Sequence, residues 1–186
     1  MSNLSWILNK LYALFGDSLA QRVTLEISDS LPNRSIAVCQ HRGNKHHIKM
    51  SSGKSLGEYT AMAAHEFAHA VLHDMLDVRV LEKKDEELAV QAIAHYAMMY
   101  ARSNCPSQEA GTLDEASKFA HDILVNRYMK DLGGTERAVS RFAVIRSAFR
   151  VMPRFLSEAL ANIERNPHQY AERTRQFTVI SGGSSY

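Results

Sequence analysis

Apolar residues recur at two different spacings along this chain, and the spacing separates strands from helices. Residues 21–27, 35–40 and 46–50 alternate or run apolar with β-branched side chains, which is typical of short strands. The last two flank Arg42-Gly43-Asn44-Lys45, a turn signal, so they predict a hairpin. Spacings of three or four predict helices over 4–14, 55–77, 86–99, 113–132, 135 to about 152 and 154–165. These elements predict an α+β fold, with a small sheet packed on a helical body.

The predicted helix at 55–77 carries the sequence His65-Glu66-Phe67-Ala68-His69. Two histidines four apart on a helix differ by about 40° around the axis and about 6 Å along it, so both rings face one metal ion. The glutamate between them can reach a metal-activated water without being a ligand. The motif predicts zinc bound by His65 and His69, with Glu66 as the general base of a metalloprotease. The alternative is a pair of packed or solvent-facing histidines on an ordinary amphipathic helix.

A zinc site of this kind needs a third protein ligand. His73 continues the four-residue series, but on a straight helix it lies about 12 Å along the axis from His65, too far for one ion. The next predicted helix offers two glutamates. Glu87 shares its face with the apolar stripe and points inward, whereas Glu86 lies about 100° away and can be a solvated first-turn residue.

These motifs resemble the ImmA/IrrE-type metallopeptidases, a family found with phages, mobile elements and bacterial stress regulators. The resemblance spans roughly 35–100 and is carried by His65-Glu66-Phe67-Ala68-His69-Ala70-Val71-Leu72-His73 and by Glu87-Leu88-Ala89-Val90-Gln91-Ala92-Ile93-Ala94-His95-Tyr96-Ala97-Met98-Met99-Tyr100. In the second stretch the family has Ala, Asn, Phe and Pro at the positions of Val90, Gln91, Ile93 and Tyr100. The resemblance implies a zincin-like fold with a sheet over the HExxH helix, and a gluzincin site of His65, His69 and Glu87 with Glu66 as base. A segment at 114–124 echoes the second pattern and offers Glu115 as another ligand.

The predicted reaction is hydrolysis of a peptide bond. The resemblance implies that an extended substrate pairs with the edge strand of the sheet. The resemblance implies that the substrate is a repressor or another regulatory protein. A further donor should stabilise the oxyanion, and the candidates are His95, Tyr96, His121 and Tyr128. Gln91, one turn after Glu87, can orient a ligand. His46 and His47 lie on opposite faces of one strand, and we expect both at the surface or the rim of the cleft rather than as metal ligands.

The C-terminal half of the chain is basic. Between 127 and 175 there are ten Lys or Arg against five acidic residues, a net of +5 in a chain whose total is +2. Arg146, Arg150 and Arg154 follow at intervals of four and can form a stripe that faces nucleic acid or an acidic partner, or a solvated face with local ion pairs. Two other functions are therefore open. One is a nucleic-acid-associated accessory protein of a phage or mobile element with a relict or structural zinc, and the other is a partner-binding scaffold whose motif is accidental.

Length and composition agree with one domain. At 186 residues and 45% hydrophobic, the chain can bury its own core over 1–180, with an α/β part to about 100, a helical part over about 101–176 and a flexible tail at 181–186. The first apolar helix lacks the basic start of a signal peptide, and no run approaches the roughly 18 apolar residues of a membrane span. We expect a cytoplasmic protein without a membrane segment, with Cys39 and Cys105 as reduced thiols.

Overall fold

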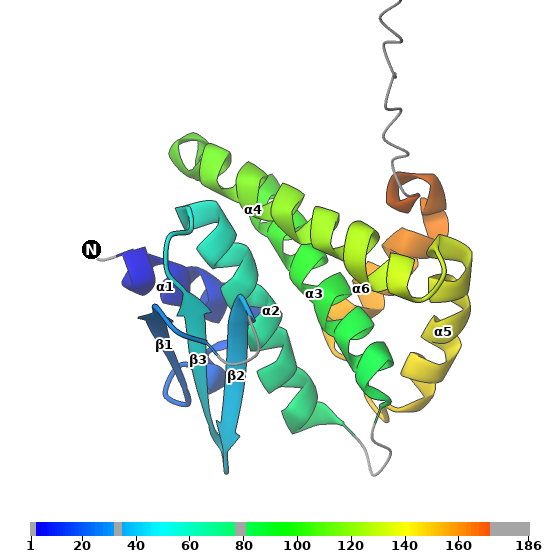
Figure 1. Cartoon of the computed structure of the whole chain (residues 1–186), viewed down its shortest axis with the longest axis horizontal. Coiled ribbons are helices and arrows are strands. Elements are labelled where there is room, and N and C mark those ends of the chain that lie inside the picture. Colours follow the sequence, from blue (N-terminus) through cyan, green and yellow to red (C-terminus); the bar gives the residue numbers. More distant parts are fainter. Residues whose placement is uncertain (1–2, 32–34, 77–80, 172–186) are drawn as a thin grey trace, which may run out of the picture.

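A three-stranded mixed sheet lies at one end of the molecule (Figure 1). The computed structural model describes residues 3–31, 35–76 and 81–171. The strands β1 (Val23–Ser28), β2 (Ala37–Arg42) and β3 (Lys45–Ser51) are arranged in the order β1-β3-β2. β2 and β3 form the predicted antiparallel hairpin, in which Gly43 supplies a positive φ of 61°, and β1 pairs parallel with β3. Their bounds differ from the predicted ones by one or two residues.

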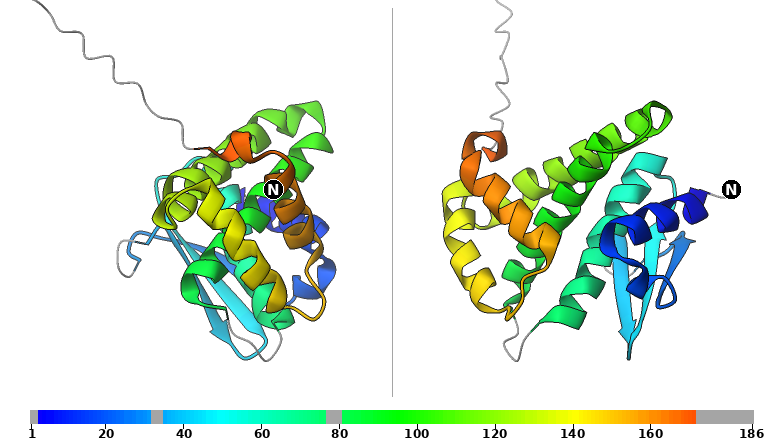
Figure 2. Two further views of the ribbon diagram at one scale, coloured as in Figure 1. Left: turned by 90° about the vertical axis from the view of Figure 1, so that its right-hand side faces the viewer. Right: turned by 180° about the vertical axis from the view of Figure 1, so that it is seen from behind.

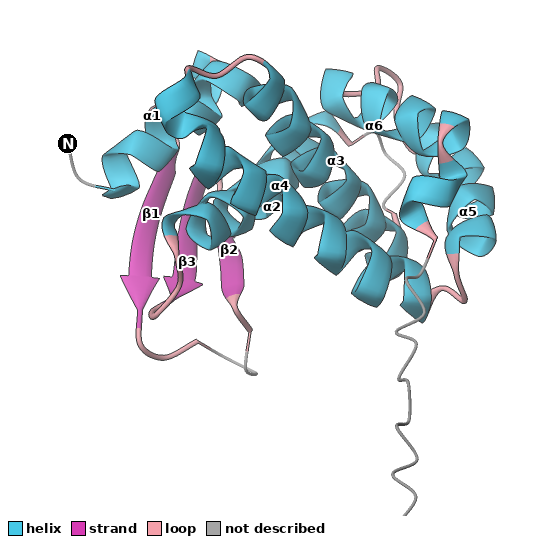
Figure 3. Ribbon diagram, turned by 90° about the horizontal axis from the view of Figure 1, so that it is seen from above, coloured by secondary structure: helices cyan, strands magenta, loops and turns pink. Residues whose placement is uncertain are grey.

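The helices α1 (Asn3–Phe15) and α2 (Leu56–Met75) cover one face of this sheet (Figures 1 and 3). Side chains alternate along β3, so His46, Ile48 and Met50 are buried against these helices. α2 begins with a capping box, in which Ser55 accepts a hydrogen bond from the backbone of Glu58 and the Glu58 carboxylate accepts one from the backbone of Ser55. The predicted end of this helix, residue 77, lies outside the described residues.

The remaining helices continue away from the sheet. α3 (Lys83–Ser103) and α4 (Ala110–Ile123) pack beside α2, and α5 (Thr135–Ser147) and α6 (Arg154–Arg165) lie at the opposite end (Figure 2). A wide π-helical turn, Leu124–Met129, continues α4. Short 3₁₀ segments occupy Asp17–Leu19, Ser107–Glu109 and Pro167–Tyr170. One cluster of buried side chains extends from α1 and the sheet to α6, and the α+β prediction is confirmed.

The predicted helix from 135 to about 152 is wrong at its end, because α5 stops at Ser147. Met152 precedes Pro153, and the proline ring disfavours helical backbone at the residue before it. Arg146, Arg150 and Arg154 therefore do not share one helix, and the geometric basis of the predicted stripe fails. Arg146 pairs with Glu164, and Arg154 pairs with Glu158 at 3.0 Å, which agrees with the alternative of local ion pairs.

Within the described ranges, none of the helices combines the length and the apolar character that crossing a bilayer demands. The tail predicted at 181–186 lies outside the described residues. The extent of the single domain stays a prediction.

Candidate metal centre

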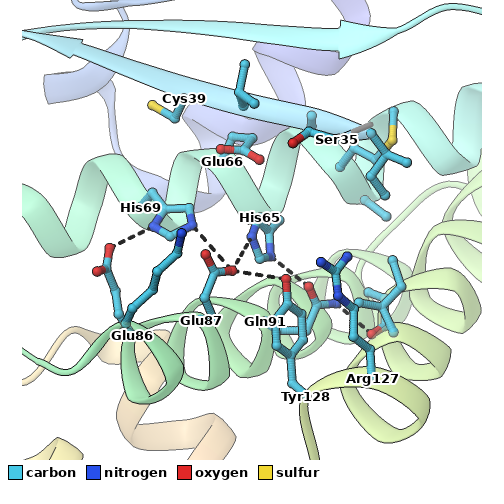
Figure 4. A pocket seen from close by; sticks show the side chains of 18 of the residues that line it. Ser35, Cys39, His65, Glu66, His69, Glu86, Glu87, Gln91, Arg127 and Tyr128 are labelled. Atoms are coloured by element: carbon cyan, nitrogen blue, oxygen red, sulfur yellow. Dashed lines mark hydrogen bonds and ion pairs between the residues drawn. The ribbon is translucent and has the colours of Figure 1, made fainter. Parts of the chain in front are cut away.

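α2 presents His65 and His69 side by side on the face that looks toward α3 (Figure 4). Their ring centroids are 5.0 Å apart, and each side chain is 14% exposed. The surrounding small residues of α2 and α3, including Ala61, Ala94 and Ala97, are buried, which lets the two helices approach closely. The predicted helix geometry of the motif is thus present.

Glu87 reaches this pair from the first turns of α3. Its Oε2 atom lies 3.4 Å from His65 Nε2 and 3.9 Å from His69 Nε2. Candidate ligand atoms of the three residues all lie within 4.8 Å of one another. A tetrahedral zinc ion with bonds of about 2 Å holds its ligand atoms roughly 3.4 Å apart, so small side-chain adjustments complete the set.

The other nitrogen of His65 is held by Gln91. His65 Nδ1 lies 2.7 Å from Gln91 Oε1, and the Gln91 amide nitrogen donates to the carbonyl of Ala120 at 2.7 Å. That second bond fixes which end of the amide is oxygen, so His65 Nδ1 must be the donor. A neutral His65 then carries its lone pair on Nε2, the nitrogen that faces Glu87.

Glu86 does the same for His69. Its Oε1 atom lies 2.9 Å from His69 Nδ1, on the side of the ring turned away from Glu87. A carboxylate accepts the Nδ1–H, and again the Nε2 lone pair is left facing Glu87. Burial lowers the pKa of His69, but the hydrogen bond to Glu86 and the surrounding carboxylates outweigh it and raise the pKa above its ordinary value.

Glu115, the other alternative ligand, is a residue of α4 whose side chain contacts the start of α2. Its Oε1 atom accepts a hydrogen bond from the Ser55 hydroxyl at 2.8 Å, and its side chain packs on Gly57. Glu87 is therefore the glutamate placed between the two histidines. Glu86 is an outer partner of one ring, and Glu115 belongs to the contact between α2 and α4.

Glu66 projects from α2 toward β2, beside the face that carries the two histidines, and lines the same cavity (Figure 4). Its side chain is buried, with 5% of the residue exposed, and it accepts a hydrogen bond from the backbone N–H of Cys39. Burial raises the pKa of Glu66, and the neighbouring imidazoles offset this only in part. A carboxylate in such a position is a stronger base than an exposed one.

Tyr128, in the π-helical turn, closes the side of the site that faces α4. Its hydroxyl donates to Glu87 Oε2 at 3.0 Å, and its ring stacks on His65 with centroids 6.0 Å apart. Burial raises the pKa of Glu87, but a protonated His65 that donates to it, the charges of both histidines and the hydrogen bond from Tyr128 lower it to about 2. Glu87 is thus an anion at neutral pH.

The three other predicted oxyanion donors lie elsewhere. His95 and His121 pack against each other and against Tyr170, and Tyr96 packs on Phe155. Among the four candidates, the structure brings Tyr128 to the histidines. The 3.6-residue period alone could not select it, because the π-helical turn shifts the phase of the helix.

The site opens into a cavity of about 710 Å³, a size that suits a small ligand or several residues of a peptide. β2 forms one wall, and α4 with the π-helical turn forms the opposite wall, so the histidines lie on the floor between them. Arg127 and Asp131 add charges of both signs to the far wall. Sequence patterns did not indicate either residue.

Comparison with protein-family models, curated proteins and solved structures finds no match to this chain. The geometry of the site therefore carries the functional argument.

Two expectations about other histidines can be compared with the structure. His46 is 1% exposed, so its predicted place at the surface is wrong; it lies on the side of β3 that faces the helices. His47 is partly exposed on the other side, next to Thr24 and Glu26, as expected. His73 stacks on His41 rather than joining His65, in agreement with the distance argument.

Proposed function

We propose that the chain is a zinc-dependent metalloprotease with a zincin-like site. The observation that carries the proposal is the convergence of three acceptors. Gln91 and Glu86 occupy the Nδ1 atoms, so two Nε2 lone pairs and an ionised carboxylate oxygen point at one another. Neutral rings and a carboxylate in such an arrangement repel unless a cation lies between them, either a proton on an imidazole or a metal ion. Two imidazoles with one carboxylate are a donor set that zinc favours.

The donor set, His65 Nε2, His69 Nε2 and Glu87 Oε2, leaves a fourth position toward the cavity. A zinc ion held by these three atoms would supply Lewis acidity toward a peptide carbonyl and toward a water molecule. Glu66 takes the proton of the attacking water and returns it to the leaving amine, and its burial keeps the carboxylate basic enough for this role. The Tyr128 hydroxyl, which donates to Glu87 Oε2, is the candidate donor for the tetrahedral oxyanion and would turn from Glu87 to reach it.

The position of β2 supports a peptide substrate. β2 pairs with β3 on one side, and its other side borders the cavity that contains the histidines. An extended peptide can add to this edge through main-chain hydrogen bonds and so cross the site. The chemistry is consistent with cleavage of a regulatory protein, as the family resemblance implies.

The test combines metal content with hydrolysis. We expect each of three variants to lose about one zinc ion per chain: His65→Ala, His69→Ala and Glu87→Ala. The matched control, Glu115→Ala, should bind as much zinc as the wild type. Glu66→Gln should keep its zinc and lose at least about 100-fold in cleavage of a peptide library read by mass spectrometry. A Glu66→Gln variant as active as the wild type, or a His65→Ala variant with undiminished zinc, would contradict the proposal.

A further inference from the structure

A second group of metal-ligating side chains lies on the sheet, at the wall of the cavity that also holds His65, His69 and Glu87. Cys39 and His41 are two residues apart on β2 and so project from the same face. His46 lies directly opposite His41 on β3. Candidate ligand atoms of these three residues all lie within 4.8 Å of one another. Strand geometry alone, without any loop, brings them together.

The two histidines meet through the same type of nitrogen. His41 Nδ1 and His46 Nδ1 are 2.8 Å apart, with the ring planes at 83°. Two neutral imidazoles can share one hydrogen in this contact, or both can turn their lone pairs to one cation. The His73 ring stacks on the His41 ring with centroids 4.6 Å apart and holds its orientation.

Among the described residues, the far nitrogen of His46, Nε2, is left without a hydrogen bond whichever ring holds the shared hydrogen. His46 Nε2 is buried and has no hydrogen-bond partner within the described ranges, and the nearest carboxylate oxygen, Asp74 Oδ1, is 3.8 Å away. A ring that binds metal through Nδ1 carries its hydrogen on Nε2, where a carboxylate commonly accepts it. Asp74 is held in place by Arg22 at 2.8 Å, so this outer partner is already positioned.

The ligand types indicate the class of metal. One thiolate and two imidazoles favour zinc and similar thiophilic ions over magnesium or calcium. Bonds of about 2.3 Å to sulfur and about 2.0 Å to nitrogen place tetrahedral ligand atoms roughly 3.5 Å apart, within a small side-chain adjustment of those seen here. Burial raises the pKa of the Cys39 thiol to about 12, with the Glu66 charge adding to the effect, so the metal must displace a proton.

We propose that Cys39 Sγ, His41 Nδ1 and His46 Nδ1 form a second site for zinc, independent of the site on α2 and α3. The fourth position is left to solvent at the exposed His41 side. This metal ties β2 to β3 near the hairpin turn. Because the backbone N–H of Cys39 binds Glu66, it also holds the strand that positions the proposed base. This proposal does not depend on the proposed peptidase function.

Cobalt(II) distinguishes the two sites, because a sulfur ligand adds a charge-transfer band in the near ultraviolet and the first site has no sulfur. We expect the wild type to bind about two cobalt ions per chain and to show this band. Cys39→Ser should lose the band and one ion, while Cys105→Ser, the matched control, keeps both. His41→Gln should weaken cobalt binding at least about 100-fold, since loss of an outer partner alone costs roughly 10- to 100-fold.

The double variant His65→Ala/His69→Ala separates this proposal from the proposed function. It should bind one ion and keep the sulfur band at full intensity. If the wild type shows no sulfur band at saturating cobalt, or if the band survives Cys39→Ser, the second site does not exist, whatever the first site binds. Conversely, a band that persists in the double variant supports the second site even if no protease is found.

Discussion

Gln91 holds the His65 ring in one tautomer, because its amide nitrogen is committed to the carbonyl of Ala120 and its oxygen is left to accept from Nδ1. The ring, the amide and the carbonyl come from three different helices, α2, α3 and α4. The packing of these helices thus determines which nitrogen of His65 is free to bind a metal. Glu86 and His69 repeat this arrangement with a carboxylate.

Replacing Gln91 should therefore weaken metal binding without removing a ligand. We expect Gln91→Ala to raise the dissociation constant for zinc by about 10- to 100-fold, as for other outer partners of metal-bound histidine. Competition with a chromogenic chelator would measure it. Gln91→Glu, which still offers an oxygen acceptor to Nδ1, should retain most of the affinity. Equal affinity in Gln91→Ala and the wild type would show that the tautomer is fixed by other means.

Tyr128 can donate a hydrogen bond to the oxyanion of the reaction, or it can serve only to position Glu87. One substitution separates these two roles. Tyr128→Phe keeps the ring stacked on His65 and removes the hydroxyl that donates to Glu87. We expect kcat to fall by about 100-fold, the cost of losing one oxyanion donor, with KM and zinc content nearly unchanged. Steady-state kinetics on a peptide found with the library would show this. A variant that loses zinc but keeps kcat when zinc is restored would assign Tyr128 to ligand positioning instead.

Gly57 is required where α2 meets α4. A Cβ atom added at Gly57 would lie 2.8 Å from Glu115 Cβ, closer than two carbons can approach. Alanine favours helix over glycine by about 1 kcal/mol, but overpacking costs typically 1–3 kcal/mol, so Gly57→Ala should lower the free energy of unfolding. Urea denaturation would measure it.

Gly111 provides the matched control for that experiment, because an added Cβ there meets no atom within 4 Å. Gly111→Ala should leave stability unchanged or raise it by up to about 1 kcal/mol. The double variant Gly57→Ala/Glu115→Gly, compared with Glu115→Gly alone, should recover most of the loss, since the Cβ atom of residue 115 is gone. A Gly57→Ala protein as stable as Gly111→Ala would contradict the close approach of the two helices.

His95 should make the fold less stable in mild acid. Its ring is 5% exposed, and burial, with the charge of His121, lowers its pKa from 6.5 to about 4. Between these values the unfolded chain binds a proton that the folded chain does not, so the free energy of unfolding falls as pH drops from about 6.5 to about 4. At about 1.4 kcal/mol per pH unit the loss approaches roughly 3 kcal/mol.

Denaturation as a function of pH tests this dependence. His95→Gln, which carries no titrating ring, should flatten the stability curve over that window, whereas His168→Gln at an exposed position should not. Parallel curves for the wild type and His95→Gln would mean that other groups cause the acid sensitivity.

The parts of the structure that depend on local pattern could be predicted from the sequence. The hairpin turn at Gly43, the helix that carries His65 and His69 and the inward face of Glu87 all follow from spacing along one element. The parallel pairing of β1 with β3 could not, because nothing local specifies which strand a third strand joins. The role of Glu86 could not be predicted either. A glutamate in the first turn of a helix can be solvated or can bind a histidine, and the sequence does not show whether a histidine ring of another helix lies beside it.

Buried polar groups escaped prediction for a related reason. Alternation places His46 on one face of β3, but only the position of α2 shows that this face is covered. A histidine is common in both environments, so its residue type did not decide between them. The helix end at Ser147 was missed because apolar residues continue at helical spacing to Met152, whereas Pro153 restricts the backbone only at Met152 itself.

The π-helical turn at Leu124–Met129 makes this part of the chain unusually tolerant of a change in length. Such a turn contains one residue more than a regular α-helical turn. The side chains after it therefore point in the directions they would have in a regular α-helix with one residue fewer. A one-residue deletion inside the turn would let it close into ordinary α-helix while the later side chains kept their directions. The same deletion within Ala110–Ile123 would rotate Tyr128 and the other side chains that follow on this helix by about 100° about its axis.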